Sequence, residues 1–429
     1  MQRATDERSR RDAMSTADAD EKSRMLAEEV ARRSYGKLVA FLAARTRDLA
    51  AAEDALSDAF ASALTDWPKN GCPCNPEAWL MTVARRKGID ATRRRMTADY
   101  AAEEIRQVAD VLAVAPNDAE IPDRRLGLMF ACAHPAIEAG IRAPLILQVV
   151  LGLTAEAIAS AFLTSPATMG QRLVRAKKKI SEAGVPFQIP EREELRERLE
   201  TVLEAIYAAF AEGWIDASGA DSVRRDLAEE AIFLGRVVVE MLPDEPEAFG
   251  LLSLMLYAEA RRRARRNAQG EFVPFAEQDA SLWDMQLIQE AESLLLSASK
   301  LATIGRYQLE ASLQSAHVFR KRTGQENWHD VVQLYDALLA MTHSPVVTIN
   351  RALAIAELDG PRVALESLRE LNGAARLSEY QPYWAARADL LAKCGAGREA
   401  HQAYEMAIGL ERDPAVRRFL QNRQSALSL

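Results

Sequence analysis

The sequence predicts an almost all-α protein. Hydrophobic residues make up 48% of the 429 residues and aromatic residues only 6%, and the chain is rich in Ala, Leu, Arg and Glu. These residues favour helix over sheet. Few stretches combine β-branched and aromatic residues with the strict alternation that is typical of strands. Because the chain exceeds the usual length of one domain, we expect several helical domains.

Breaks in the helical pattern divide the chain into five segments. The first is polar and is expected to be a disordered leader. Two helical blocks follow, separated by an acidic linker, and the motif "GVPFQIP" at residues 184–190 precedes a long C-terminal helical domain. The segments are residues 1–24 (leader), 25–95 (first block), 96–122 (linker), 123–185 (second block) and 186–429 (C-terminal domain). Within the first block, the prolines of Trp67–Trp79 predict a loop between two helices.

The negative charge lies mainly in the C-terminal domain. Residues 1–189 hold 27 Lys/Arg and 25 Asp/Glu, and the remaining residues hold 27 and 37 of the total of 54 and 62. Nucleic-acid binding is therefore open for the first half and disfavoured for the second. The N-terminus lacks the apolar core of a signal peptide, no stretch is a convincing membrane span, and four cysteines suit a reducing compartment. We expect a soluble cytoplasmic protein.

The segment "LTSPATMGQRLVRAKKKI" predicts a helix that begins at Ser165. Thr154 can cap a preceding short helix, and Ser165 can cap this one, with Pro166 in the first turn, where its missing N–H costs nothing. An apolar stripe of Met169, Leu173, Ala176 and Ile180 lies on one face. The other face carries the groups that contact base edges and phosphates in a major groove. We expect DNA contacts from Ser165, Thr168, Gln171, Arg172, Arg175, Lys178 and Lys179. The alternative is a solvated basic face.

Two further surfaces lie in the first block. "LAAAEDALSDAFASALTDW" predicts a helix with an acidic outer ridge of Glu53, Asp54 and Asp58. Such a ridge is either solvated or a docking surface for a basic partner. The next helix, "EAWLMTVARRKGIDATRRR", combines an aromatic residue with cations, as suits melted or single-stranded DNA. Its candidate contacts are Trp79, Arg85, Arg86, Arg93, Arg94 and Arg95.

Weak internal repeats occur near the C-terminus. Val331, Ala364 and Ala400 are equivalent positions, spaced 33 and 36 residues apart, with larger residues four positions later each time, Tyr335, Leu368 and Tyr404. The period resembles that of tetratricopeptide repeats, which stack into a superhelix that binds other polypeptides. An ordinary helical bundle is the alternative.

Together these motifs resemble the extracytoplasmic-function group of bacterial RNA polymerase sigma factors. "DLAAAEDALSDAFASAL" and "EAWLMTVARRKGIDATRRR" look like region 2 of that family, and "LTAEAIASAFLTSPATMGQRLVRAKKKI" looks like its helix-turn-helix region 4. "DRRLGLMFACAHPAI", "MLPDEPEAFGLLSLMLYAEARRRAR" and "QDASLWD" extend the resemblance to a subgroup with a C-terminal tetratricopeptide-like domain.

The resemblance implies a role in transcription initiation. The acidic ridge would bind the β′ clamp helices of core RNA polymerase, and the β flap would be a second contact. The helix of Trp79 would hold the −10 promoter element, and the helix that starts at Ser165 would recognise the −35 element. Gly170 stands where family members often carry a cation, which puts the contacts there in doubt. The C-terminal domain would regulate or support activity, and attachment in cis would strengthen any intramolecular contact with the sigma domains.

Other chemistry is less well supported by the residues. Cys72, Cys74, Cys132 and His134 could form a zinc site, but the spacing is unusually tight and the pairs fall in different blocks, so incidental thiols are favoured. The basic run "EARRRARR" (residues 259–266) is either a solvated or internally paired patch or an electrostatic latch. The sequence has no catalytic motif, so we expect neither an enzyme nor a cofactor. The rival function is a helix-turn-helix repressor with a ligand- or peptide-sensing repeat domain, which leaves the first block without a purpose.

Overall fold

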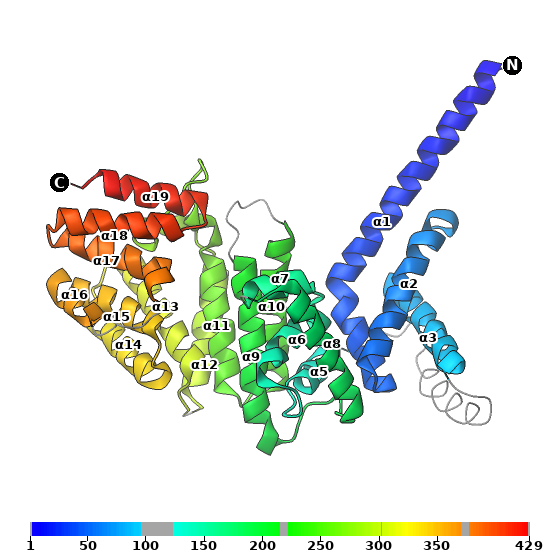
Figure 1. The fold of residues 1–429 in the computed structure, drawn as a ribbon, viewed down its shortest axis with the longest axis horizontal. Helices are drawn as coiled ribbons and strands as arrows, with labels where there is room; N and C mark the ends of the chain where they lie inside the picture. Colours follow the sequence, from blue (N-terminus) through cyan, green and yellow to red (C-terminus); the bar gives the residue numbers. More distant parts are fainter. Residues whose placement is uncertain are drawn as a thin grey trace. The chain divides into compact units, whose positions relative to one another are not determined.

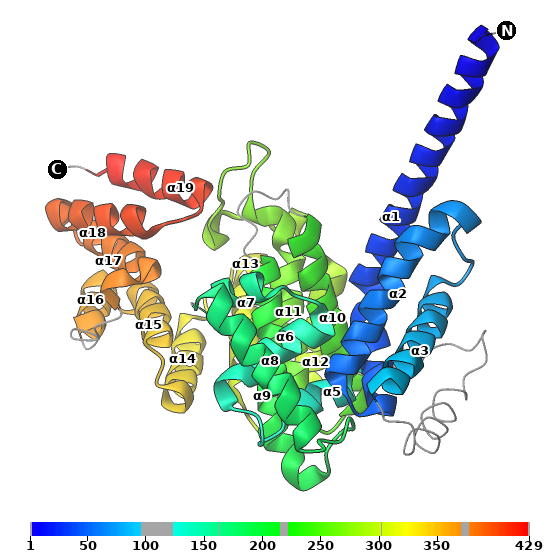
Figure 2. The ribbon, with the colours of Figure 1, turned by 45° about the vertical axis from the view of Figure 1, so that its right-hand side comes forward.

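The protein is all-α, as the sequence predicts. The computed structural model describes residues 2–95, 123–162, 164–214, 222–301, 303–369 and 377–427 (Figures 1 and 2). Within these ranges the regular elements are helices, with an isolated antiparallel bridge between Arg266 and Phe272. The chain divides into two compact units, Met1–Ala209 and Phe210–Leu429. The linker expected at residues 96–122 lies outside the described residues. No helix of the described residues is long and apolar enough to cross a membrane.

The first unit combines the two predicted helical blocks. Helix α1 packs against α2 and α3, α5 packs against α6, and α7 packs against α8. Contacts of α1 with α5 and α6, and of α2 with α8, join the two blocks. The helices are α1 (Gln2–Thr46), α2 (Leu49–Asn70), α3 (Pro76–Arg95), α5 (Arg125–Cys132), α6 (Ala139–Leu151), α7 (Ala155–Ala161), α8 (Pro166–Glu182) and the start of α9 (Arg192–Trp214).

Two boundaries differ from the sequence expectation. The expected disordered leader is helical, because α1 begins at Gln2 and the first 35 residues contain no Gly or Pro to interrupt a helix. The unit boundary falls at residue 209 instead of 185. The segment after α8 packs back on the first unit, since a Cβ on Gly127 would lie 3.1 Å from the backbone oxygen of Phe187.

The loop expected at Trp67–Trp79 is shorter in the structure. Helix α2 continues through Pro68 to Asn70, and α3 already begins at Pro76. Pro68 removes one i→i−4 hydrogen bond from the last turn of α2, whereas Pro76 removes none, because first-turn N–H groups have no partner within the helix. Gly71 ends α2 with φ of 86°, a conformation that favours glycine.

The capping predicted for the second block is confirmed. The Thr154 Oγ1 accepts a hydrogen bond of 3.2 Å from the N–H of Ala157, and the Ser165 Oγ accepts one of 3.2 Å from the N–H of Thr168. The apolar stripe of α8 is buried, with exposures of 5% or less at Met169, Leu173, Ala176 and Ile180. These features fix where α8 begins and which face it turns outward.

The second unit is a succession of helices in which sequence neighbours pack on one another from α10 to α19. They are α10 (Ser222–Met241), α11 (Pro246–Ala260), α12 (Met285–Ser299), α13 (Arg306–Thr323), α14 (Trp328–Thr342), α15 (Pro345–Leu358), α16 (Pro361–Arg369), α17 (Gln381–Lys393), α18 (Gly397–Leu410) and α19 (Pro414–Ser425). The short 3₁₀ helices are η1 (Arg262–Arg265), η2 (Phe275–Glu277), η3 (Ala280–Leu282) and η4 (Leu377–Glu379).

The equivalent positions of the sequence repeats occupy equivalent environments. Val331, Ala364 and Ala400 are each fully buried. Four residues later, Leu368 and Tyr404 are also buried, and Tyr335 packs against the cluster around Leu338. A small buried residue at each position lets neighbouring helices approach closely.

Candidate functional site

Helix α8 presents the polar face that the sequence predicts. Gln171, Arg175, Lys178 and Lys179 are exposed, as are Ser165 and Thr168 at the helix start. A Cβ added at Gly170 would meet nothing within 4 Å, so a larger residue there would extend this face.

Arg172 is less accessible than its neighbours on α8. Its Nη2 lies 3.1 Å from Oε1 of Glu138, and 31% of the side chain is exposed. Sequence reasoning missed Val174, which is 67% exposed and lies three residues from Gln171 and four from Lys178, hence on the same side of the helix. A methyl-bearing side chain in this position can contact thymine methyl groups.

The acidic residues of α2 do not form a single exposed ridge. Asp54 and Asp58 are exposed, but Glu53 turns toward α8, where its Oε2 lies 2.8 Å from the Nζ of Lys177. Only 13% of the Glu53 side chain and 16% of the Lys177 side chain are exposed. Burial raises the pKa of Glu53, and the charge of Lys177 opposes that shift. Glu53 is therefore engaged inside the unit, and Asp54 and Asp58 are the residues available to a partner.

A second contact holds the two helical blocks together. A Cβ on Gly36 of α1 would lie 1.9 Å from the backbone oxygen of Val150 in α6, so only glycine allows this approach. The nearby Tyr35 hydroxyl has a raised pKa because it is buried and because Glu53 and Asp54 are negative. The first unit thus has a closed arrangement, in which α6 and α8 lie against α1 and α2.

The residues of α3 divide between the core and the surface. Trp79 makes an edge-to-face contact with Trp67, with ring centroids 5.5 Å apart, and is half-buried. Arg85 is half-buried with its guanidinium 5.9 Å from the ring centre of Phe41, whereas Arg86 is exposed. Arg93, Arg94 and Arg95 end α3, and their side chains lie outside what the structure describes.

Sequence reasoning also missed a cationic cluster around Phe41. The guanidinium of Arg45 lies 5.5 Å from the same ring that Arg85 covers, and the Nε atoms of both arginines are buried without a hydrogen-bond partner. Burial, followed by the charge of Arg45, lowers the pKa of Arg85, and burial and Arg124 do the same for Arg45. Arg45, Arg85 and Arg124 therefore place three cations in one region, which suits an anion such as a phosphate. No local sequence pattern could have revealed this cluster, because its residues come from three separate parts of the chain, at α1, α3 and the start of α5.

The cysteines do not converge. Cys132 is fully buried in α5, where burial raises the pKa of its thiol, whereas Cys72 lies in the loop after α2, with its Sγ 3.7 Å from Oγ of Ser23. Across the described ranges, no three His, Cys, Asp or Glu side chains are grouped as metal ligands would be.

Comparison with known proteins identifies the class of the first unit. Residues 30–97 match the family described as Sigma-70 region 2, and residues 198–299 match one described as "Family of unknown function (DUF6596)". The region 2 match supports a sigma factor role in transcription initiation, which involves core RNA polymerase and promoter DNA. The class acts by binding and not by catalysis.

Most of the chain matches a relative in Rhizobium meliloti (strain 1021). The sequence is 39% identical over 369 residues to the protein named "Uncharacterized protein R00370", and the match covers 85% of this chain and 87% of the relative. The chain belongs to the same family as this Rhizobium protein. No solved structure matches the sequence.

Proposed function

We propose that the protein is an extracytoplasmic-function sigma factor with a fused, tetratricopeptide-like regulatory domain. The observation that carries the proposal is the combination, in one compact unit, of a sigma-70 region 2 with a capped helix that exposes a polar and cationic face. In this proposal α7 and α8 form the helix-turn-helix of region 4. A repressor would need α8 but would have no use for region 2.

Each surface has an assigned partner. Asp54 and Asp58, which are exposed on α2, bind the clamp helices of the polymerase β′ subunit. Arg86 and the end of α3 contact the −10 element, with the Arg45–Arg85 cluster next to a phosphate. Gln171 and Arg175 on α8 contact the −35 element. Trp79 supports the −10 site by packing on Trp67, which holds α3 against α2.

Promoter engagement requires the first unit to open. The −10 and −35 elements are separate stretches of DNA, whereas α2 and α8 contact each other through Glu53 and Lys177. The closed arrangement is therefore a resting form, and binding energy from polymerase and DNA shifts the population toward an open form. The C-terminal helices act on this equilibrium in cis.

Run-off transcription with purified core polymerase tests the proposal. The full chain must confer initiation at a defined promoter, whereas a repressor would bind DNA without conferring any. Asp54→Arg with Asp58→Arg must weaken binding to core polymerase, because both side chains are exposed and the charge reversal repels a basic partner helix. The matched control is Glu29→Arg, an exposed acid on α1 that pairs with Arg33 in the same helix. Unchanged core binding by the double variant refutes the docking assignment.

A further inference from the structure

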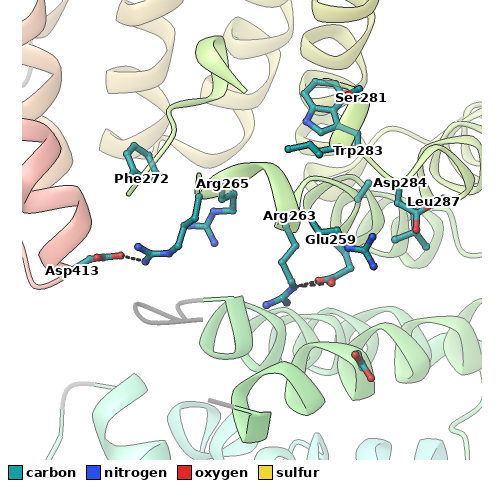
Figure 3. Close-up of a pocket in the computed structure, with 14 residues that line it drawn as sticks. Glu259, Arg263, Arg265, Phe272, Ser281, Trp283, Asp284, Leu287 and Asp413 are labelled. Atoms are coloured by element: carbon teal, nitrogen blue, oxygen red, sulfur yellow. Dashed lines mark hydrogen bonds and ion pairs between the residues drawn. The ribbon is translucent and has the colours of Figure 1, made fainter. Parts of the chain in front are cut away.

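The second unit contains a cavity that the sigma factor role does not use. Its volume is about 740 Å³, within the range of small-molecule sites, which is roughly 300–1,000 Å³. The walls come from α10, α11, η1, η3, the start of α12 and the residue before α19 (Figure 3). Most of these residues belong to the "EARRRARR" run and the segment that follows it.

The cationic wall of the cavity is held in place by its backbone. Ala264 at the centre of η1 is buried, and the N–H of Val273 donates a hydrogen bond of 2.8 Å to the backbone oxygen of Arg265. The bridge between Arg266 and Phe272 closes the turn at Gly270, whose φ is 77°. The arginine side chains therefore project from a fixed backbone, which reduces the entropy cost of binding a ligand.

Two of these arginines already bind carboxylates of the chain. The Nε of Arg262 lies 2.7 Å from Oε1 of Glu259, and Nη2 of Arg266 lies 2.7 Å from Oδ2 of Asp413. Figure 3 shows Asp413 and Glu259 on the cavity wall. These internal pairs show that the wall suits anionic groups, since the planar guanidinium matches carboxylate and phosphate geometry.

Arg263 adds a cation to this wall, and no acid of the described residues is ion-paired with it. It is exposed and forms no ion pair with them, and it lines the cavity (Figure 3). Four acids also line the cavity. Glu259 and Asp413 pair with other arginines, Asp284 caps α12 by accepting hydrogen bonds from Gln286 and Leu287, and Glu229 is exposed, so none of the four forms an ion pair with Arg263.

Arg261 places a further cation next to η1. It is half-buried, and its desolvation, together with the charge of Arg265, lowers the pKa of Arg261 to about 10. Like charges that are held close together and partly desolvated raise the free energy of the empty site, and an anion that binds there lowers it.

Apolar residues also line the cavity, and one of them, Trp283, holds an unmet hydrogen-bond donor. Trp283 lines the cavity with 4% of its surface exposed, and its Nε1–H is buried with no acceptor among the described residues. Buried donors in folded proteins are almost always paired. Leu287 and Phe272 complete an apolar surface near this group. Glu229, an exposed acid on the α10 side, disfavours a second negative group on the ligand.

We infer that the cavity binds a small organic anion with a single anionic group, a phosphate monoester or a carboxylate, whose anionic end is held by Arg263 and whose apolar body packs on Trp283 and Leu287. The ligand would enter between the segment that carries the arginines and the start of α19, where Asp413 pairs with Arg266. An anion that competes for Arg266 releases Asp413, so binding couples to the attachment of the last helix. The inference is independent of the sigma factor role, and its failure would leave that role untouched.

Calorimetric titration of the full chain with three probes tests the inference. Phenyl phosphate should bind saturably at one site and more tightly than inorganic phosphate, which lacks the apolar body, while phenol should not bind. Arg263→Gln should weaken phenyl phosphate binding about ten-fold or more, since a hydrogen bond to a charged group contributes about 1.5–3 kcal/mol. Arg263 is exposed, so this variant should fold as the parent does. The control is Arg398→Gln on α18, an exposed arginine that does not line the cavity.

Three outcomes would overturn the inference. The first is the absence of saturable phenyl phosphate binding at millimolar concentration. The second is equal affinity in the parent and in Arg263→Gln, or equal loss in Arg398→Gln. The third is binding of a short single-stranded oligonucleotide at this site with no response to phenyl phosphate, which would assign the arginines to nucleic acid. Trp283→Phe, which keeps the ring and removes the N–H, should weaken phenyl phosphate binding a few-fold while leaving inorganic phosphate weak as before.

Discussion

Replacement of Lys177 by Met should open the first unit. The substitution keeps the length of the side chain and removes the charge that pairs with Glu53 at 2.8 Å. In the closed form the Glu53 carboxylate would then be mostly buried, with 13% of its side chain exposed and no compensating cation. In the open form the same carboxylate is hydrated, so the variant penalises only the closed form.

The magnitude follows from the burial of the pair. Removing one partner of a fully buried ion pair costs about 3–5 kcal/mol, and residual exposure together with protonation of Glu53 lowers this to about 2–3 kcal/mol. At 1.4 kcal/mol for each factor of ten, the closed-to-open ratio falls about 30- to 150-fold. Glu53→Gln combined with Lys177→Met should restore closure, since the unpaired charge is gone.

Distance measurements between spin labels on α2 and α8 provide the assay. Labels at Lys69 and Lys179, both exposed, report the separation of the helices after Cys72, Cys74 and Cys394 have been replaced by Ser. Lys177→Met should add a long-distance population that the parent lacks.

The matched control for this assay is Lys178→Met. Lys178 is the next residue along α8, with 76% of its side chain exposed and a 3.4 Å pair to Glu182 in the same helix. Identical distance distributions for Lys177→Met, Lys178→Met and the parent would refute the assignment of the Glu53–Lys177 pair as the closing contact.

Three further predictions concern pH, packing and salt. His317 accepts from Arg320 at 3.0 Å, and burial with Arg320 and Arg261 lowers its pKa to about 4. The unfolded chain takes up this proton at its ordinary value of 6.5, so stability should fall by up to about 3 kcal/mol as pH drops from 6.5 toward 4. Urea unfolding at several pH values checks this, and the fall between pH 6.5 and 5 should be clearly smaller in His317→Gln. Gly36→Ala should destabilise the first unit by about 1–3 kcal/mol in thermal unfolding, because its Cβ would meet a backbone oxygen at 1.9 Å. Gly88→Ala, whose Cβ would point into open space, should not destabilise the protein. Equal melting temperatures for Gly36→Ala and the parent would contradict the close approach. Arg175→Gln should lower the salt slope of duplex DNA binding by about one, measured by fluorescence anisotropy, and an unchanged slope would remove Arg175 from the DNA contact.

Local patterns in the sequence predicted the helices and their faces. The buried stripe of α8 and its Ser165 cap follow from residues three to four positions apart, so periodicity and capping chemistry suffice to find them. The small residues at Val331, Ala364 and Ala400 were found in the same way, because each repeat has the same local packing.

Contacts between distant segments were beyond the reach of these patterns. Glu53 and Lys177 are 124 residues apart, and nothing near either residue distinguishes it from a solvated charge. The convergence of Arg45 and Arg85 on Phe41 likewise depends on how three helices pack. The helical leader was missed for a different reason, since its polar composition suggested disorder although it lacks helix breakers.

The two sides of α8 are independent design surfaces. Lys177 and Leu173 lie on the side that packs inside the unit, and Gln171 and Arg175 lie on the opposite side, in solvent. If α8 contacts the −35 element as proposed, substitutions at Gln171 and Arg175 would change its preference for DNA sequence without altering the Glu53–Lys177 contact that closes the unit. A set of such variants would recognise different promoters and would still open with the same free-energy cost. A change at Lys177 would alter that cost equally in every variant of the set.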